Sequence, residues 1–228
     1  MMNWKRGSAV VVMAAVLLAL AGASQAAVID LALLLKNGSF EDAEALDGVT
    51  AGVPTDWTVF NSNSSSSAVY NPLPTEGLQA VYGSQYARVT TNATSTLSTW
   101  YKLQQADLAT AVAGDTYTLT VSVGHIAGVA FSSWAGYNQV QLWVGGTKYY
   151  TDITDPGNGL WKEVTVSHTV SEAEAGQAIM VQLMAGNYKG QGARAVAFDI
   201  APAPIPEPAT MGLLVLGGVA ALLRRRRN

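Results

Sequence analysis

Seven residues, Tyr117-Thr-Leu-Thr-Val-Ser-Val123, alternate between apolar and polar side chains without a break. Successive side chains of a β-strand point to opposite faces of a sheet, so this alternation predicts a strand with one buried and one solvent-facing side. The same pattern recurs in Val140–Val144 and Val164–Val170. Half-buried strands of this kind are typical of antiparallel sheets.

Shorter signals extend the pattern over the rest of the body. Gly145-Gly146 predicts a hairpin turn, and Asn61–Ser67 predicts a surface loop. The two helix-like stretches, Gln104–Ala113 and Glu172–Ala175, are too short to cover a parallel sheet. We therefore expect an all-β fold, an antiparallel β-sandwich of the jelly-roll type over residues 27–201. The remaining predicted strands are Gln85–Thr90, Thr96–Leu103, Thr147–Thr151, Ile179–Ala185 and Ala193–Ile200.

The apolar composition belongs largely to the two ends of the chain. Of 228 residues, 49% are hydrophobic and only 13% are charged, and two apolar runs lie at Ala9–Ala23 and Ala209–Leu223. The segment 27–208 carries seven basic and 16 acidic residues, a formal charge of −9. Such a charge disfavours nucleic-acid binding, which depends on Lys and Arg. The absence of cysteine excludes disulfides and thiolate chemistry.

The first apolar run predicts a secretory signal peptide at residues 1–26. Lys5 and Arg6 precede it, and the small residues Ser24 and Ala26 mark a cleavage site. A permanent N-terminal anchor is the alternative. The run is shorter than the ~20 residues that span a bilayer, which favours the signal peptide.

The second apolar run predicts a membrane helix at 209–223, after a Pro-rich linker at 202–208 and before an Arg-rich tail at 224–228. An α-helix of that length is roughly 22 Å long, against a hydrocarbon core of ~30 Å, so arginine stems would extend its reach. Basic residues beside a membrane helix stay in the cytoplasm. The body is thus expected on the opposite side of the membrane.

The order of these C-terminal elements resembles the PEP-CTERM sorting signal of Gram-negative bacteria. The resemblance implies recognition by the membrane protease exosortase, with the protein anchored in the inner membrane before processing and then located in the periplasm, at the cell surface or in the exopolysaccharide matrix of a biofilm. A permanent C-terminal anchor is the alternative. The sorting residues are Pro206, Glu207, Pro208, Arg224, Arg225, Arg226 and Arg227.

A second resemblance covers the body. Asn37–Glu41, Val53–Trp57, Ala113–Leu119 and Val196–Ile200 resemble the galactose-binding-like jelly rolls and related carbohydrate-binding modules. The resemblance implies that Glu41 and Asp199 help to hold a structural calcium ion, which takes six to eight oxygen ligands. Solvated acids at strand ends are the alternative.

Aromatic residues in loops suggest a ligand site. Flat rings stack on sugar faces, and Trp134, Tyr137 and Tyr188 lie in predicted loops, so these three are the ligand-binding candidates. The resemblance places Trp57 and Trp161 in the core. Trp143 alternates away from its apolar neighbours, on a sheet face that is either exposed or covered by another layer.

No catalytic residues are predicted. The chain has two histidines, His125 and His168, without an HExxH or GxSxG motif. We expect a non-catalytic surface or matrix protein that binds polysaccharide. The alternatives are a secreted glycan-active hydrolase and, third, an ice-binding protein. We expect the chain to lack the regular Thr-x-Thr ladder of a flat ice-binding face, which counts against the third.

Overall fold

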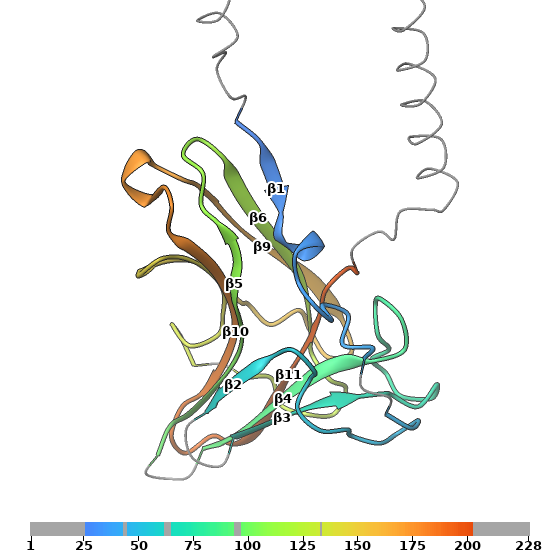
Figure 1. Ribbon diagram of the computed structural model, residues 1–228. Coiled ribbons are helices and arrows are strands. Elements are labelled where there is room, and N and C mark those ends of the chain that lie inside the picture. Colours follow the sequence, from blue (N-terminus) through green and yellow to red (C-terminus); the bar gives the residue numbers. More distant parts are fainter. Residues whose placement is uncertain (1–25, 43–44, 62–64, 94–96, 133, 203–228) are drawn as a thin grey trace, which may run out of the picture.

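The computed structural model describes residues 26–42, 45–61, 65–93, 97–132 and 134–202. Over these ranges the chain forms two packed β-sheets and two short 3-10 helices, η1 (Leu31–Leu33) and η2 (Glu172–Glu174) (Figure 1). The predicted all-β sandwich is confirmed. The sequence features predicted at 1–25 and 203–228 lie outside the described ranges, and no helix within those ranges is both long and apolar enough to cross a membrane.

The first sheet, sheet A, is built around β6. Strand β9 pairs along the full length of β6, so β1 and β11 share its other edge. The pairing of β1 with β6 is parallel, and the other pairings in sheet A are antiparallel. Its strands are β1 (Val28–Asp30), β3 (Ser65–Tyr70), β4 (Tyr86–Ala93), β6 (Thr116–Gly124), β9 (Trp161–Thr169) and β11 (Gly192–Asp199).

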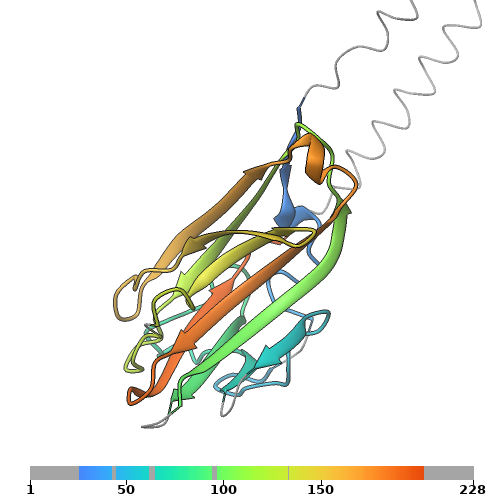
Figure 2. The same cartoon turned by 90° about the vertical axis from the view of Figure 1, so that its left-hand side faces the viewer.

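The second sheet, sheet B, is antiparallel, with strand order β2-β5-β10-β7-β8. Strands β5 and β10 bow toward sheet A, so the outer face of sheet B is concave (Figure 1), and Figure 2 looks onto that face. The hairpin predicted at Gly145-Gly146 joins β7 to β8. The strands of sheet B are β2 (Thr58–Asn61), β5 (Thr99–Thr110), β7 (Gln139–Val144), β8 (Thr147–Asp152) and β10 (Ala178–Asn187).

Alternating apolar residues from the two sheets meet to form one core. Leu119, Val121 and Val123 of β6 are fully buried, as the alternation predicts. Trp57 is also in this core, with its ring 5.5 Å from that of Phe40. Trp161 is only partly buried and packs on a smaller second cluster.

Two local predictions are wrong. Gln104–Ala113 is not helical, because β5 continues through Thr110 in register with β10, with a bulge near Asp107, whose φ is 54°. Tertiary pairing has overridden local helix propensity here. The serine tract is not all loop either: Ser65–Tyr70 pair with β4, although residues 62–64 lie outside the described ranges.

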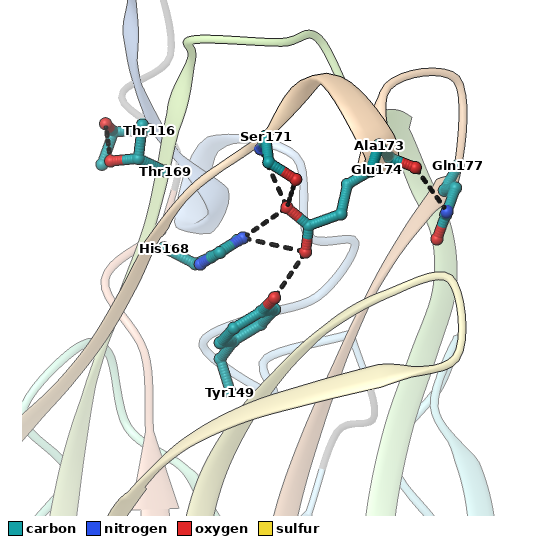
Figure 3. Close-up of polar contacts among 8 residues, drawn as sticks. All are labelled: Thr116, Tyr149, His168, Thr169, Ser171, Ala173, Glu174 and Gln177. Carbon is teal, nitrogen blue, oxygen red and sulfur yellow. Dashed lines mark hydrogen bonds and ion pairs between the residues drawn. The ribbon is translucent and has the colours of Figure 1, made fainter.

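The neighbouring edges of the two sheets are joined by Tyr149 of β8, His168 of β9 and Glu174 of η2 (Figure 3). The Tyr149 and His168 rings stack, with centroids 3.5 Å apart. The Glu174 carboxylate accepts hydrogen bonds from Tyr149, from His168 Nε2 at 3.0 Å and from the Ser171 hydroxyl at 2.7 Å. The bonds from Tyr149 and Ser171 lower the pKa of Glu174, and the same Tyr149 bond raises the pKa of Tyr149. We call these three residues the edge clasp.

Candidate functional site

Three aromatic side chains gather at one end of sheet B. The Trp134 and Tyr137 rings are stacked, with centroids 3.7 Å apart and planes 15° apart. The Tyr188 ring lies edge-on to Trp134 at 6.1 Å and is 46% exposed. These are the three ligand-binding candidates from the sequence, and the structure brings them together as one aromatic cluster. Ligand binding by them stays a prediction.

The cluster is held against the end of β10 by backbone contacts. The Trp134 backbone N–H donates to the Gly186 carbonyl at 3.2 Å, and the Gly186 N–H donates to Asn138 Oδ1 at 2.9 Å. A Cβ at Gly186 would lie only 2.3 Å from the Tyr137 Cβ and 3.1 Å from the Trp134 ring. Glycine at position 186 is therefore what allows the aromatic loop to pack so closely on the strand.

A first hollow, the loop pocket, lies on the Trp134 side of the stack and has a volume of about 470 Å³. It combines one guanidinium with two carboxylates. The Arg194 Nη1 donates to the Phe131 carbonyl at 2.8 Å, whereas its buried Nε has no partner within the described ranges. Residues that define the loop pocket are Phe131, Trp134, Asn138, Asp152, Asp155 and Arg194.

Asp155 is fixed at the rim of this pocket. Its Oδ1 accepts from the Gly157 N–H at 2.8 Å and contacts His125 Nδ1 at 2.7 Å. The other ring nitrogen of His125 faces the Val129 carbonyl at 2.8 Å. Both ring nitrogens of His125 are thus engaged, which fixes the orientation of the ring beside Asp155. His125 thus orients Asp155.

A second hollow, the sheet groove, lies on the Tyr137 side and has a volume of about 290 Å³. Trp143 is half-buried on the outer face of sheet B, uncovered by any further layer in the described chain, and its Nε1 donates to Gln141 Oε1 at 3.0 Å. Gly136 lines both hollows, so the two are neighbours across the aromatic stack. Residues that define the sheet groove are Lys102, Tyr137, Gln141, Trp143, Lys148 and Met184.

Glutamine side chains run across the outer face beside the groove. Gln104, Gln182 and Gln141 are neighbours in register on three adjacent strands. Gln182 Nε2 donates to Gln104 Oε1 at 2.7 Å, but its buried Oε1 has no partner within the described ranges. The row offers amide groups of the kind that bind sugar hydroxyls.

Sequence reasoning did not find the outward-facing residues of sheet B. In strands where apolar and polar residues alternate, Lys102, Gln141 and Lys148 occupy polar positions. A polar side chain is expected there in any solvent-facing strand. Arg194 was equally unremarkable in a strand. The signal that could have found them is Trp143, a large apolar residue at a polar position.

The two calcium candidates also lie close to each other. Asp199 is fully buried; its Oδ2 accepts from the Val81 and Tyr82 N–H groups at 2.8 and 2.9 Å, and its Oδ1 has no hydrogen-bond partner in the described chain. Burial raises the pKa of Asp199 to about 7; the Tyr82 and Val81 bonds lower it, and the negative charge of Glu41 raises it further. Glu41 accepts from the N–H groups of Ser84 and Gln85. A buried carboxylate oxygen without a partner, near a second carboxylate, fits a calcium ion, although the described residues hold no cluster of three or more acidic or histidine side chains.

Sheet A carries a hydroxyl ladder that the sequence analysis missed. Thr116, Thr118 and Thr120 of β6 bond to Thr169, Ser167 and Thr165 of β9 at 2.8, 3.0 and 2.9 Å. The first of these pairs is drawn in Figure 3. A Thr-x-Thr repeat was thus present, and the expectation that the chain lacks one is wrong.

Comparison with known proteins identifies the body. The model of the HpiC1-like family, described as HpiC1 cyclase, matches residues 32–201. The chain belongs to the HpiC1-like family. The HpiC1-like match replaces the expected galactose-binding-like assignment, while the β-sandwich remains. No curated protein matches the sequence.

The PEP-CTERM protein-sorting motif matches residues 204–227 of this HpiC1-like chain, which confirms the sorting signal expected there. The motif marks an exported protein with a membrane-associated C-terminus before processing.

Two solved cyclase structures with TM-scores above 0.5 support the fold. The cyclase FisC from Fischerella sp. TAU, in complex with (3Z)-3-(1-methyl-2-pyrrolidinylidene)-3H-indole, is 21% identical, with 72% of this HpiC1-like chain and 92% of that chain covered and a TM-score of 0.58. A cyclase from the same organism, in complex with 4-(1H-indol-3-yl)butan-2-one, is also 21% identical. The match covers 72% of this chain and 92% of that chain, with a TM-score of 0.56. TmCBM61, in complex with β-1,4-galactotriose, is 18% identical. The match covers 73% of this chain and 94% of that chain, with a TM-score of 0.49.

Proposed function

We propose that this exported protein is a non-catalytic component of the cell surface or exopolysaccharide matrix that binds an extended polysaccharide. The observation that carries the proposal is the aromatic stack between two polar hollows. Trp134 and Tyr137 stack on each other, and each lines a different hollow, so a ligand can reach one ring from the loop pocket and the other from the sheet groove. Rings with hydrogen-bonding groups beside them match the apolar faces and hydroxyls of sugars.

The arrangement suits a chain of several sugars better than a small molecule. The loop pocket and the sheet groove adjoin at Gly136, and a ligand that touches both must cross the aromatic cluster. Beyond the groove, Gln104 and Gln182 continue the polar surface along sheet B. A polymer would gain from all these contacts at once, whereas a single sugar would use one hollow.

Calcium is part of the proposal as a structural ion. Glu41 and Asp199 would hold it, with backbone carbonyls and waters completing the oxygen shell. Its role would be to keep the loop at Val81 and Tyr82 attached to the end of β11, since Asp199 already binds that loop. In this proposal the calcium ion does not contact the polysaccharide.

Sorting is proposed to end in processing of the C-terminal tail by exosortase. The support is the PEP-CTERM match at 204–227. Mass measurement of protein from membrane, periplasm and medium of an exporting host tests this. Material outside the membrane that lacks the tail supports processing, and membrane-bound material that retains 209–228 as the only form rejects it.

A hydrolase is the competing candidate, favoured by one observation: Asp152 and Asp155 both line the loop pocket. Glycoside hydrolysis needs two carboxylates on opposite sides of a sugar bond. Asp152, however, accepts a hydrogen bond from Gln139 at 2.9 Å, and Asp155 is engaged by His125.

Ice binding would use the ladder on sheet A, but each of its hydroxyl pairs is already bonded internally, so we expect no thermal hysteresis from the protein.

The test is a glycan array probed with the full-length chain in detergent. Retention on a polysaccharide, without release of reducing ends, supports binding. Release that is lost in Asp155→Asn would favour the hydrolase. The indole ligand 4-(1H-indol-3-yl)butan-2-one is a further probe, and tight binding of it in place of any glycan would reject the proposal in favour of a cyclase-like pocket.

A further inference from the structure

Two lysines converge on the sheet groove in a body that is otherwise acidic. Lys102 of β5 and Lys148 of β8 both line the groove, on either side of β10 and β7. They are two of only seven basic residues between 27 and 208, a segment with a formal charge of −9. Like charges placed together against the overall charge of a domain need a reason.

Neither lysine is neutralised by a carboxylate. In the described part of the chain, no acidic side chain forms an ion pair with Lys102 or Lys148. The Lys102 ammonium lies 5.4 Å from the centre of the Trp100 ring, and the Lys148 ammonium lies 4.4 Å from that of Tyr150. Lys148 also donates to Gln139 Oε1 at 3.2 Å, which leaves further N–H groups for a ligand.

The surroundings make this charge costly without an anion. Lys102 is partly buried; burial lowers its pKa, and the positive charge of Lys148 lowers it further. Asp152 lies on the same strand and face as Lys148, and its Oδ1 accepts a hydrogen bond from Gln139 Nε2 without forming an ion pair with either lysine. A negative group in the groove would lie between two ammonium groups and offset their mutual repulsion.

The other side chains of the groove indicate which kind of molecule carries the negative group. Tyr137 offers a ring face, Trp143 lies beside the amide of Gln141, and the unpaired Gln182 Oε1 lies in the adjoining row. A free inorganic anion would use none of these. We infer that the sheet groove binds a carboxylate-bearing sugar residue through Lys102 and Lys148, so that the ligand is an acidic polysaccharide; this inference rests on the proposed function.

The experiment compares one polymer in two charge states. Calorimetry with the full-length chain in detergent measures affinity for polygalacturonate and for its methyl ester, which has the same sugars without the charge. We expect at least tenfold tighter binding of the acid at low salt, and a preference that shrinks as salt screens the lysines. The variant Lys102→Gln/Lys148→Gln should lose the preference, whereas Lys36→Gln, which removes a charge outside the groove, should keep it.

The outcomes separate the inference from the proposed function. Equal affinity for acid and ester, without salt dependence, overturns the acidic ligand and leaves polysaccharide binding standing. No affinity for these or for any arrayed glycan overturns both. If the double variant unfolds, the ester and salt comparisons on the unaltered protein still decide the question.

Discussion

The ring of Trp134 lies parallel to that of Tyr137 at 3.7 Å, and the pair separates the loop pocket from the sheet groove. Neither ring belongs to a regular strand; both come from the loop before β7. Their mutual stacking therefore replaces the rigidity that a sheet would give. A ligand would meet a platform that is already ordered, so little conformational entropy would be lost on binding.

We expect Trp134→Ala to weaken polysaccharide binding at least tenfold, because it removes one stacking face and leaves Tyr137 unsupported. Affinity electrophoresis through a gel containing the polysaccharide measures this. Leu160→Ala, which removes an exposed apolar side chain that lines neither hollow, serves as the control. Undiminished retention of the Trp134 variant would contradict the assignment of the site.

Gly186→Ala should weaken binding although residue 186 lines neither hollow. The new Cβ would meet the Tyr137 Cβ at 2.3 Å, an atom too close to the backbone to turn aside, so the whole aromatic loop must shift. Gly146→Ala, at the open tip of the β7–β8 hairpin, adds the same methyl group without a contact. Calorimetry on the two variants should show a loss of affinity in the first alone; equal affinities would show that the loop position does not matter.

Asp199 should make cation-free protein less stable as pH rises. Its pKa is raised in the folded state from 3.8 to about 7, so its contribution is fully present below pH 3.8 and is lost as pH rises through 7. A shift of this size corresponds to roughly 4 kcal/mol. Thermal unfolding in chelator between pH 4 and 8 measures it, and Asp199→Asn should flatten the curve while Asp42→Asn should not.

Calcium should reverse that trend, because a bound cation favours the ionised carboxylate. We expect added Ca²⁺ at pH 8 to raise the melting temperature of the unaltered protein and to leave Asp199→Asn unchanged. Equal shifts in both proteins would mean that any bound ion is held elsewhere.

The edge clasp predicts the opposite pH dependence. Because the pKa of Glu174 is lowered in the folded state, its stabilisation is present above its ordinary value of 4.5 and is lost as the pH falls toward the lowered value. Glu174→Gln should lower the melting temperature at pH 7, because it replaces the carboxylate that accepts hydrogen bonds from Tyr149, His168 and Ser171. Glu172→Gln, an exposed neighbour in η2, is the control, and similar melting temperatures for both variants would argue against the clasp.

Much of the architecture followed from period-two alternation. Strands with one solvated face, such as β6 and β9, can be predicted from the sequence, because burial on a single side imposes the alternating pattern. The second half of β5 was missed because Gln104–Thr110 has no such pattern and is a strand only through its pairing with β10. Short edge strands such as β2 carry too few residues for a pattern to emerge.

The site was predictable to a smaller extent. Loop aromatics are conspicuous, and Trp134, Tyr137 and Tyr188 do come together. Lys102 and Lys148 are 46 residues apart in sequence and look like ordinary solvent-facing charges. Only the strand order of sheet B places them at one groove, and strand order is not encoded in local patterns.

The direction of β11 has a consequence for how the protein would work while attached to a membrane. This strand begins at Gly192, beside the aromatic end, and runs toward the pole where β1 lies, since Asp199 pairs with Ser122 and β1 pairs with Thr116–Thr118. Figure 2 shows the β10–β11 turn at the lower left and β1 at the upper end. The sorting motif follows soon after, at residue 204. Attachment through residues that follow β11 would therefore leave the aromatic cluster at the other end of the strand uncovered, so the proposed capture of a polymer and attachment to the bilayer would not compete for the same surface.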